Sequence, residues 1–469
     1  MSQVSGSDSL RSKVLRGGAY LGFRQLAGLF INVVGILLLT RALGPAAYGR
    51  YAAALGLFGA LQLGAQLGIG VFLVRSERPI ERDGLDVAAS LLALSGIVAL
   101  VVGALLAFWF DQWTRIEGVS STALALLVAL PLINVAQVAT AQLDRALDYK
   151  RVAWIELASQ AMFFSVSVPL ALAGFGSWAA VAGWWCQQIG LLVGTSWAAR
   201  YVPRPAWQPA LAREMLSYGF SYSLSIWIYQ LRRLANPIVV GRYLGAEAVG
   251  IVSLATQIVT QLGFAGVIAW RVSTASLARV QSSADRLVRA ITDGMWLQAL
   301  VVGPVLVLFA WVAPALLPLL LGRSWEPLAT VYPFLALSFL ANAMFALHSS
   351  ALYVVRRNLD VGIVHFVQLV LLFGVAAAVV PQAGLVGYGV AEAATIVSYP
   401  LMHLFVRRHM GKPSYGRALA VTSSFSVALF FNSLGWVSGL GILVLACVLP
   451  SWPETQRLVA DLRSAAAAS

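Results

Sequence analysis

Residues 41–49 read RALGPAAYG, and residues 242–250 read RYLGAEAVG. The two stretches share five of nine positions at an offset of 201 residues, and each begins with arginine and ends with glycine. Each lies between two long apolar runs. A repeat at a fixed offset indicates that one structural unit occurs twice. We therefore expect two related lobes, residues 1–205 and 206–412, followed by an appendage formed by residues 413–469.

The chain around these two stretches is too apolar for a water-soluble protein. Of its 469 residues, 59% are hydrophobic and 11% are charged, whereas soluble domains carry about 25% charged residues. Apolar runs of about 20 residues, enough to cross a bilayer as a helix, recur along the chain. Lipid leaves no backbone group unpaired, which favours helices. We predict an all-α polytopic membrane protein with about fourteen spans: two parallel six-helix lobes plus two C-terminal helices.

The expected spans follow from the positions of the apolar runs. They cover residues 17–43, 48–74, 84–110, 119–143, 152–173, 176–199, 213–241, 247–270, 288–321, 327–354, 361–380, 384–406, 416–433 and 435–450. Residues 416–450 have an alternative interpretation as one re-entrant pair, which would leave twelve full spans.

The distribution of basic residues predicts the orientation of these spans in the membrane. Of the 32 Lys and Arg residues, 24 lie at one set of alternating loops and tails, five at the other, and three within spans. Basic residues collect on the cytoplasmic side of membrane proteins, so we expect both termini in the cytoplasm. Six spans separate the two repeat stretches, so the lobes have the same orientation. This distribution also accounts for the net charge of +13 without a nucleic-acid partner.

The three arginines within spans are the strongest functional candidates. A charged residue at mid-span costs about 2.5–3.5 kcal/mol on insertion scales, so it usually faces protein or water and marks a pathway. Arg24, Gly28, Asn32 and Gly35 share one helix face, and the 201-residue offset places a second polar face on the first helix of the other lobe. We predict that both faces line a central cavity. The predicted substrate-binding residues are Arg24, Asn32, Tyr229, Arg232, Arg233 and Asn236.

Some of these residues have alternatives. Arg24 lies near one end of its span, so its side chain can instead extend to the interface. Adjacent arginines diverge by about 100° around a helix, so only one of Arg232 and Arg233 is expected to point inward. Glu392, in the middle of a span, is a candidate for proton or cation coupling, with a buried structural hydrogen bond as the alternative.

The sequence contains no enzyme signature. It has no glycine-rich phosphate loop with its lysine and no cluster of metal-ligand residues. We therefore expect no catalytic residues, no metal and no cofactor.

Three stretches resemble a known family: Lys13-Val-Leu-Arg-Gly-Gly18, Leu39 to Tyr51, and Gly241 to Gly250. They are similar to the polysaccharide transporter family, the Wzx-type flippases of O-antigen and exopolysaccharide synthesis. This family belongs to the multidrug/oligosaccharidyl-lipid/polysaccharide exporter (MOP) superfamily. The resemblance implies a V-shaped two-lobe bundle that alternates access across the inner (plasma) membrane. It also implies an undecaprenyl-diphosphate-linked oligosaccharide as substrate, with membrane lipids and polysaccharide polymerase or export proteins as partners.

Two other functions remain open. One is a cation-coupled small-molecule or drug antiporter of the same superfamily, which would need an acidic site deep in a lobe. Carboxylates are sparse within the spans of this chain. The other is a non-transporting scaffold of an envelope assembly complex, which would have no need of arginines within the membrane.

Overall fold

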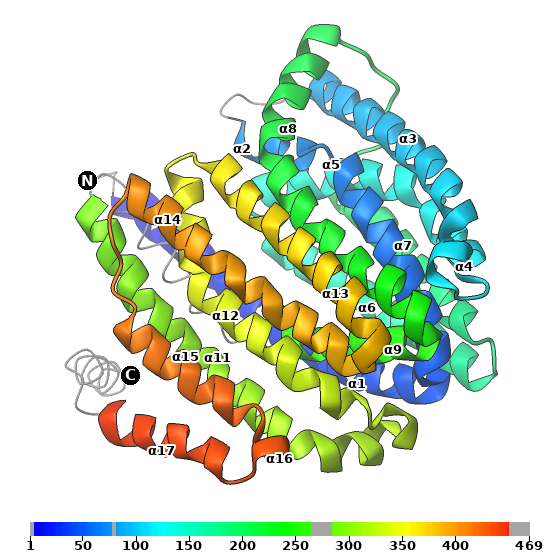
Figure 1. Cartoon of the computed structure of the whole chain (residues 1–469). Helices are drawn as coiled ribbons and strands as arrows, with labels where there is room; N and C mark the ends of the chain where they lie inside the picture. The colour runs from blue at the N-terminus through cyan, green and yellow to red at the C-terminus, as the bar shows by residue number, and fades with distance from the viewer. Residues whose placement is uncertain (1–3, 77–80, 265–283, 450–469) are drawn as a thin grey trace. The chain divides into compact units, whose positions relative to one another are not determined.

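The computed structural model describes residues 4–76, 81–264 and 284–449 (Figure 1). Side chains are described over the same ranges except at residues 4–26, 75, 218–226 and 284. Every regular element in these ranges is a helix, which confirms the predicted all-α fold class. The chain forms two compact units: residues 1–253, 320–325 and 376–388 form the first, and residues 254–319, 326–375 and 389–469 form the second.

The first unit is built mainly from the N-terminal half of the chain. Its helices are α1 (Val4–Ala65), α2 (Ile69–Arg75), α3 (Arg82–Thr114), α4 (Val119–Leu127), α5 (Leu130–Arg145), α6 (Tyr149–Leu172), α7 (Ser177–Ala199), α8 (Pro209–Leu231), η1 (Arg232–Leu234), η2 (Asn236–Val240), the first part of α9 (Gly241–Leu262) and η3 (Arg323–Trp325).

The second unit contains most of the helices that follow α9. These are α11 (Ala284–Leu321), α12 (Leu328–Val354), much of α13 (Asn358–Ala394), η4 (Thr395–Ser398), α14 (Tyr399–His409), α15 (Gly416–Ala428), α16 (Phe431–Leu434) and α17 (Val437–Val448).

Eight described segments are long and apolar enough to cross a membrane. Three of them overlap two expected spans each: Ala27–Ala65 has 39 residues, Trp227–Leu262 has 36 and Asn358–His409 has 52, whereas one span needs about 20. Each is broken at a glycine with positive φ, namely Gly44 (69°), Gly245 (82°) and Gly384 (58°). An L-residue with a Cβ rarely adopts this conformation, so these glycines permit the chain to turn between successive helices.

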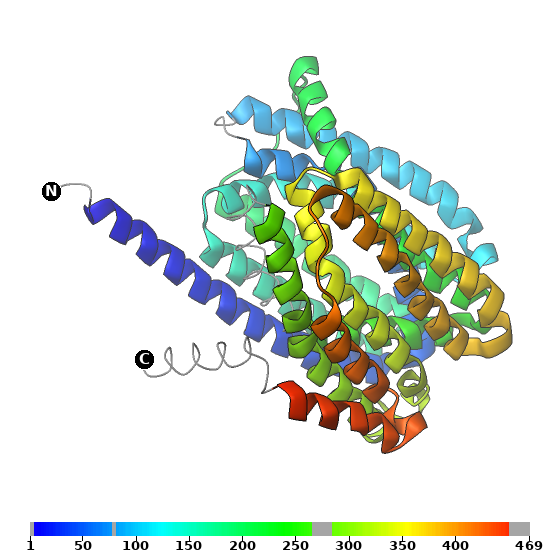
Figure 2. The same cartoon turned by 60° about the vertical axis from the view of Figure 1, so that its left-hand side comes forward.

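The last helices are short. Within the described residues, α15 has 13 residues and α17 has 12, lengths more typical of re-entrant or buried helices than of full spans. The two helices pack against each other, and Figure 2 shows them at the C-terminal end of the coloured chain, in orange to red. These lengths agree with the alternative of a re-entrant pair at residues 416–450.

Apolar burial joins α2, α3, α5 and α8 in the first unit. Ile69, Leu92, Val138 and Met215, one from each helix, are each fully buried in a single cluster. Close approach of α3 to α5 depends on Gly96, where an added Cβ would lie 2.6 Å from Cα of Pro131. The core therefore combines large apolar side chains with glycine contacts, as is common between membrane helices.

Candidate functional site

The helix that carries the predicted arginine pair is not a regular α-helix. It changes from α8 to a 3₁₀-helix at Arg232–Leu234 and then to a π-helix at Asn236–Val240. Pro237 has no N–H to donate to the carbonyl of Arg233, four residues earlier, which explains a departure from α-helical bonding here. Short 3₁₀ and π segments inside helices often mark functional positions. Residues 232–240 are referred to below as the helix break.

Arg233 lies against the second half of α1. A Cβ added at Gly56 would lie 3.4 Å from the carbonyl oxygen of Arg233, and one added at Gly59 would lie 3.6 Å from its Nη1 atom. The backbone and the guanidinium therefore both follow a glycine face of α1. The Arg233 side chain is nevertheless exposed, which leaves guanidinium surface for an anion.

Arg232 has a different environment. Its guanidinium carbon lies 5.5 Å from the centroid of the Tyr229 ring, within the range of a cation–π contact. Tyr229 keeps 38% of its surface exposed, whereas Arg232 is half-buried. One turn earlier, Trp227 Nε1 donates a 2.9 Å hydrogen bond to the carbonyl of Ala60. The Trp227 bond holds the end of α8 against α1.

Asn236 contributes to packing. Only 8% of its surface is exposed, and its Nδ2 atom donates to the carbonyl of Val249 at 3.1 Å and to Ser253 Oγ at 2.9 Å. Its Oδ1 atom is buried without a hydrogen-bond partner. The amide nitrogen therefore fastens the helix break to α9.

The polar face predicted on the first helix is explained in part by packing. An added Cβ at Gly28 would lie 3.3 Å from Gln160 Oε1, and one at Gly35 would collide with the ring of Phe164. Gln160 Nε2 also donates to the carbonyl of Gly28 at 3.1 Å. These two glycines allow α1 to approach α6. Asn32 lies between them and is half-buried.

Arg24 and Glu392 complete the predicted set. Arg24 lies in α1 but outside the range of described side chains. Glu392 lies in the second unit and is half-buried. Its carbonyl accepts a 2.7 Å hydrogen bond from Thr395 Oγ1, at the point where α13 gives way to the 3₁₀-helix η4.

The two repeat stretches cross each other within the first unit. An added Cβ at Gly49 would collide with the carbonyl oxygen of Ala246, and one at Gly250 would collide with the carbonyl oxygen of Pro45. The offset of 201 residues relates Pro45 to Ala246 and Gly49 to Gly250, so the contact is reciprocal. Only glycine lets the two backbones approach this closely.

A polar cluster that the sequence did not predict surrounds Asp86 on α3. Only 4% of Asp86 is exposed. Its Oδ1 atom accepts hydrogen bonds from Tyr201 Oη at 2.8 Å and from the backbone N–H of Arg204 at 3.1 Å. Ser90 Oγ accepts a third bond, from the N–H of Ala206 at 3.0 Å. Burial and the hydrogen bond to Asp86 raise the pKa of Tyr201. These bonds fasten residues 201–206 to α3.

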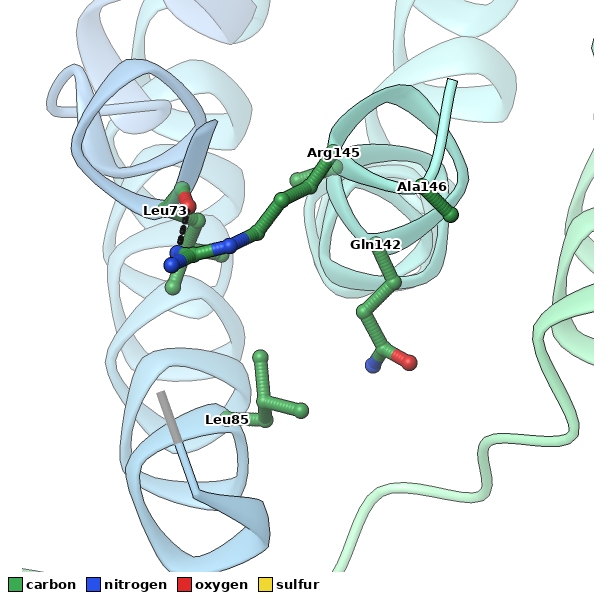
Figure 3. A pocket seen from close by; sticks show the side chains of 6 residues that line it. Leu73, Leu85, Gln142, Arg145 and Ala146 are labelled. Carbon is green, nitrogen blue, oxygen red and sulfur yellow. Dashed lines mark hydrogen bonds between the residues drawn. The ribbon is translucent and has the colours of Figure 1, made fainter. Parts of the chain in front are cut away.

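A cavity of about 320 Å³ lies between the ends of α2, α3 and α5 (Figure 3). Leu73, Leu85, Gln142 and Arg145 line it, and none of them belongs to the predicted site. The Arg145 guanidinium points at the carbonyl of Leu73 and donates to it at 3.0 Å. This cation therefore contributes to helix packing. Among the described residues, no group of three or more His, Cys, Asp and Glu side chains could hold a metal ion.

Comparison with known proteins identifies relatives of this chain. A family model described as polysaccharide biosynthesis protein matches residues 38–330, more than half of the sequence. The chain is also 25% identical over 318 residues to the succinoglycan biosynthesis transport protein ExoT of Rhizobium meliloti (strain 1021). That alignment covers 66% of this chain and 62% of the relative, less than two thirds of its length.

Solved structures share the fold. Lipid II flippase MurJ in an inward closed conformation aligns with a TM-score of 0.69 at 13% identity, over 92% of this chain and 97% of that one. An inward-facing multidrug resistance MATE family transporter of the MOP superfamily aligns with a TM-score of 0.60 at 17% identity, over 85% and 99% of the two chains. Both comparisons confirm the predicted helical polytopic fold.

Proposed function

The chain belongs to the polysaccharide biosynthesis protein family, and we therefore propose that it is a flippase for a polyprenyl-diphosphate-linked oligosaccharide. The observation that carries this proposal is the arginine pair at the helix break, where Arg233 remains exposed beside the glycine face of α1. The names of the relatives ExoT and MurJ support a lipid-linked saccharide as the substrate class.

The chemistry of the helix break suits a diphosphate. Guanidinium groups are weakly hydrated and bind phosphate oxygens through paired hydrogen bonds, so they function at sites from which water is partly excluded. Tyr229 next to Arg232 presents an exposed aromatic ring, a surface on which a sugar could pack. In the proposed site, Arg233 binds the diphosphate, Arg232 and Tyr229 flank the first sugar, and Arg24 and Asn32 take up the diphosphate at another depth.

The proposed cycle is alternating access by two lobes in the inner membrane with both termini in the cytoplasm. The diphosphate head and glycan enter a cationic cavity while the polyprenyl tail remains in lipid. Transfer of one charge across 100 mV is worth about 2.3 kcal/mol, so a diphosphate of charge near −2 gains about 4–5 kcal/mol when it moves outward. The membrane potential could therefore drive net movement, with Glu392 in an assisting role.

Flipping in reconstituted vesicles tests the site. Arg233→Ala should lower the translocation rate at least tenfold, and Arg233→Lys should retain part of it because the charge remains without the paired donors. Arg242→Ala is a matched control, because Arg242 is an exposed arginine on the next helix. Equal rates for Arg233→Ala and Arg242→Ala would contradict the proposed diphosphate site.

The same vesicles separate the energy sources. With an imposed potential and no ion gradient, we expect translocation that increases with the potential and survives Glu392→Gln. With an ion gradient alone, Glu392→Gln should remove any gradient-driven component. Translocation that is indifferent to the potential would refute the electrophoretic mechanism.

A further inference from the structure

The cavity at the ends of α2, α3 and α5 has apolar walls that belong to the core of the first unit. Leu73 and Ala141 line it, are 2% and 5% exposed, and are members of the buried cluster described above. Leu85 also lines it and packs against that cluster. The core therefore sets the shape of the cavity. Its volume of about 320 Å³ lies in the range of about 300–1,000 Å³ that is usual for small-molecule sites.

Arg145 gives this cavity its charge. It is the last residue of α5 and its side chain is exposed. The guanidinium reaches from α5 to α2, where it donates to the carbonyl of Leu73 at 3.0 Å (Figure 3). A bond to a neutral carbonyl orients the guanidinium and leaves its positive charge in place. Among the six described residues that line the cavity, Arg145 is the one charged side chain.

Two carboxylates near the cavity are directed away from it. Asp86 follows Leu85 in the chain, but its Oδ1 atom accepts the hydrogen bond of the Tyr201 hydroxyl. Asp148 follows α5 and forms an ion pair with Arg151 at 3.2 Å. Neither carboxylate lines the cavity. The charge on the cavity wall is therefore positive.

Gln142 adds a neutral donor to the same cavity. It lies three residues before Arg145, so the two side chains share one face of α5. Its Nε2 atom is buried and has no hydrogen-bond partner among the described residues. Figure 3 shows this nitrogen turned to the side of Leu85. The last torsion of glutamine is broad, so the amide can turn toward a ligand. A buried N–H without an acceptor costs stability, and an anion in the cavity would satisfy it.

The length of the neighbouring span places Arg145 at the depth of the lipid phosphates. Together, α4 and α5 cover the candidate span Val119–Arg145, which has 27 residues. At 1.5 Å per residue this is about 40 Å, the thickness of a bilayer with its headgroups. Arg145 ends the span, so it lies at headgroup level. Basic pockets between membrane helices at this level bind anionic lipid headgroups.

We propose that this cavity binds the phosphate of an anionic phospholipid. Arg145 pairs with the phosphate oxygens, which guanidinium groups bind through paired hydrogen bonds. Gln142 donates a neutral hydrogen bond to the same group, and the glycerol and first acyl carbons pack on Leu73 and Leu85. None of these residues belongs to the helix break or to the polar face of α1. The bound lipid is therefore a component of the first unit and is distinct from the transported substrate.

Titration of the melting temperature measures this binding, because a ligand of the native state raises stability. The full-length protein is freed of lipid in detergent and titrated with phosphatidylglycerol or with phosphatidylcholine of the same acyl chains. We expect wild type to bind phosphatidylglycerol more tightly, and Arg145→Ala to bind it about tenfold or more weakly than wild type. Arg151→Ala is the matched control, since Arg151 is exposed near the same end and does not line the cavity.

The difference between the two arginine variants decides the proposal. Equal phosphatidylglycerol affinities for Arg145→Ala and Arg151→Ala would overturn it. Equal affinities of wild type for the two lipids would do the same.

Gln142→Leu separates lipid binding from folding and keeps the test valid if Arg145→Ala does not fold. The substitution removes a buried donor that has no acceptor, so the melting temperature without lipid should stay unchanged or rise. The affinity for phosphatidylglycerol should fall about two- to tenfold, the contribution of one neutral hydrogen bond. A purely structural role would change the first quantity and not the second. Unchanged affinity in this variant would overturn the proposed site.

Inorganic phosphate distinguishes a lipid site from a site for a free anion. Contacts of the lipid with Leu73 and Leu85 add to its affinity, so phosphate should displace phosphatidylglycerol no better than chloride at the same ionic strength. Specific displacement by phosphate would overturn the assignment to a lipid. The titrations involve no translocation, so their result is independent of the proposed flippase function.

Discussion

Asp86→Ala would remove the carboxylate oxygen that fastens residues 201–206 to α3. That oxygen accepts hydrogen bonds from the Tyr201 hydroxyl at 2.8 Å and from the Arg204 backbone at 3.1 Å. Tyr201 is itself only 5% exposed, so the lost acceptor is not replaced freely by water. We expect this substitution to destabilise the protein more than is usual for a residue near the start of a membrane helix.

The size of the effect follows from the two bonds. A hydrogen bond to a charged group contributes about 1.5–3 kcal/mol. Bonds that share an acceptor are not independent, so we expect a total loss of about 3–5 kcal/mol. Asp86→Asn keeps an oxygen acceptor without the charge. Neutral bonds contribute about 0.5–1.5 kcal/mol each, so this variant should lie between wild type and alanine.

Thermal denaturation in detergent and amide hydrogen exchange would measure the two consequences. The melting temperature should fall in the order wild type, Asp86→Asn, Asp86→Ala. Exchange at the Arg204 amide should accelerate at least tenfold in Asp86→Ala, since about 1.4 kcal/mol corresponds to a factor of ten. Asp83→Ala is the control, because Asp83 is exposed in the first turn of the same helix. Equal behaviour of Asp86→Ala and Asp83→Ala would refute the reasoning.

Three further predictions concern the first unit. Gly49→Ala should destabilise the protein by about 1–3 kcal/mol, because the added Cβ would collide with the backbone of residue Ala246. Gly374→Ala is the control, since there is open space around Gly374. The melting temperature should fall for Gly49→Ala and stay unchanged for Gly374→Ala. Pro237→Ala restores a helical N–H, so we expect an unchanged or higher melting temperature together with slower flipping in vesicles. Flipping at the wild-type rate would show that the helix break is not needed for function. Tyr201 has a raised pKa in the folded state, so its contribution to stability is complete below about pH 10 and is lost as the pH rises further. Above pH 10, Tyr201→Phe should therefore lose stability less steeply than wild type, by up to about 1.4 kcal/mol per pH unit. Parallel profiles of stability against pH for the two proteins would contradict this prediction.

The helical fold could be predicted from sequence because it depends on short stretches of the chain, namely apolar runs and the residues between them. Apolar runs predict helices wherever lipid demands internal hydrogen bonds. The glycines of the repeat, Gly44 and Gly245, both adopt positive φ where one expected span gives way to the next. A glycine between apolar runs is a strong signal for such a turn.

The site was harder to predict from sequence than the fold, because the pattern of one helix face does not show which other helix packs against it. Gly28 and Gly35 share a face with Asn32, and the sequence predicted that this face lines a cavity. The structure packs both glycines against α6, more than 120 residues away in the chain. Small residues seven positions apart are themselves a signal for close helix packing, and that signal competes with the polar one.

Buried polar clusters were missed for a similar reason. Asp86 was visible as a carboxylate inside an expected span, but its partner Tyr201 is 115 residues away. Residues that meet only in the folded chain leave no common pattern in a single sequence. The 3₁₀ and π segments of the helix break were also unforeseen, although Pro237 was the available sign.

The crossing of Gly49 and Gly250 has a consequence for the inheritance of this sequence. Each glycine faces the backbone of the other stretch, so a larger residue at one position cannot be offset by a smaller one opposite, where no side chain exists to shorten. The two codons, 201 positions apart, are therefore exposed to the same purifying selection. In descendants that retain the crossing, both positions should still encode glycine even after the rest of the two repeats has diverged beyond recognition.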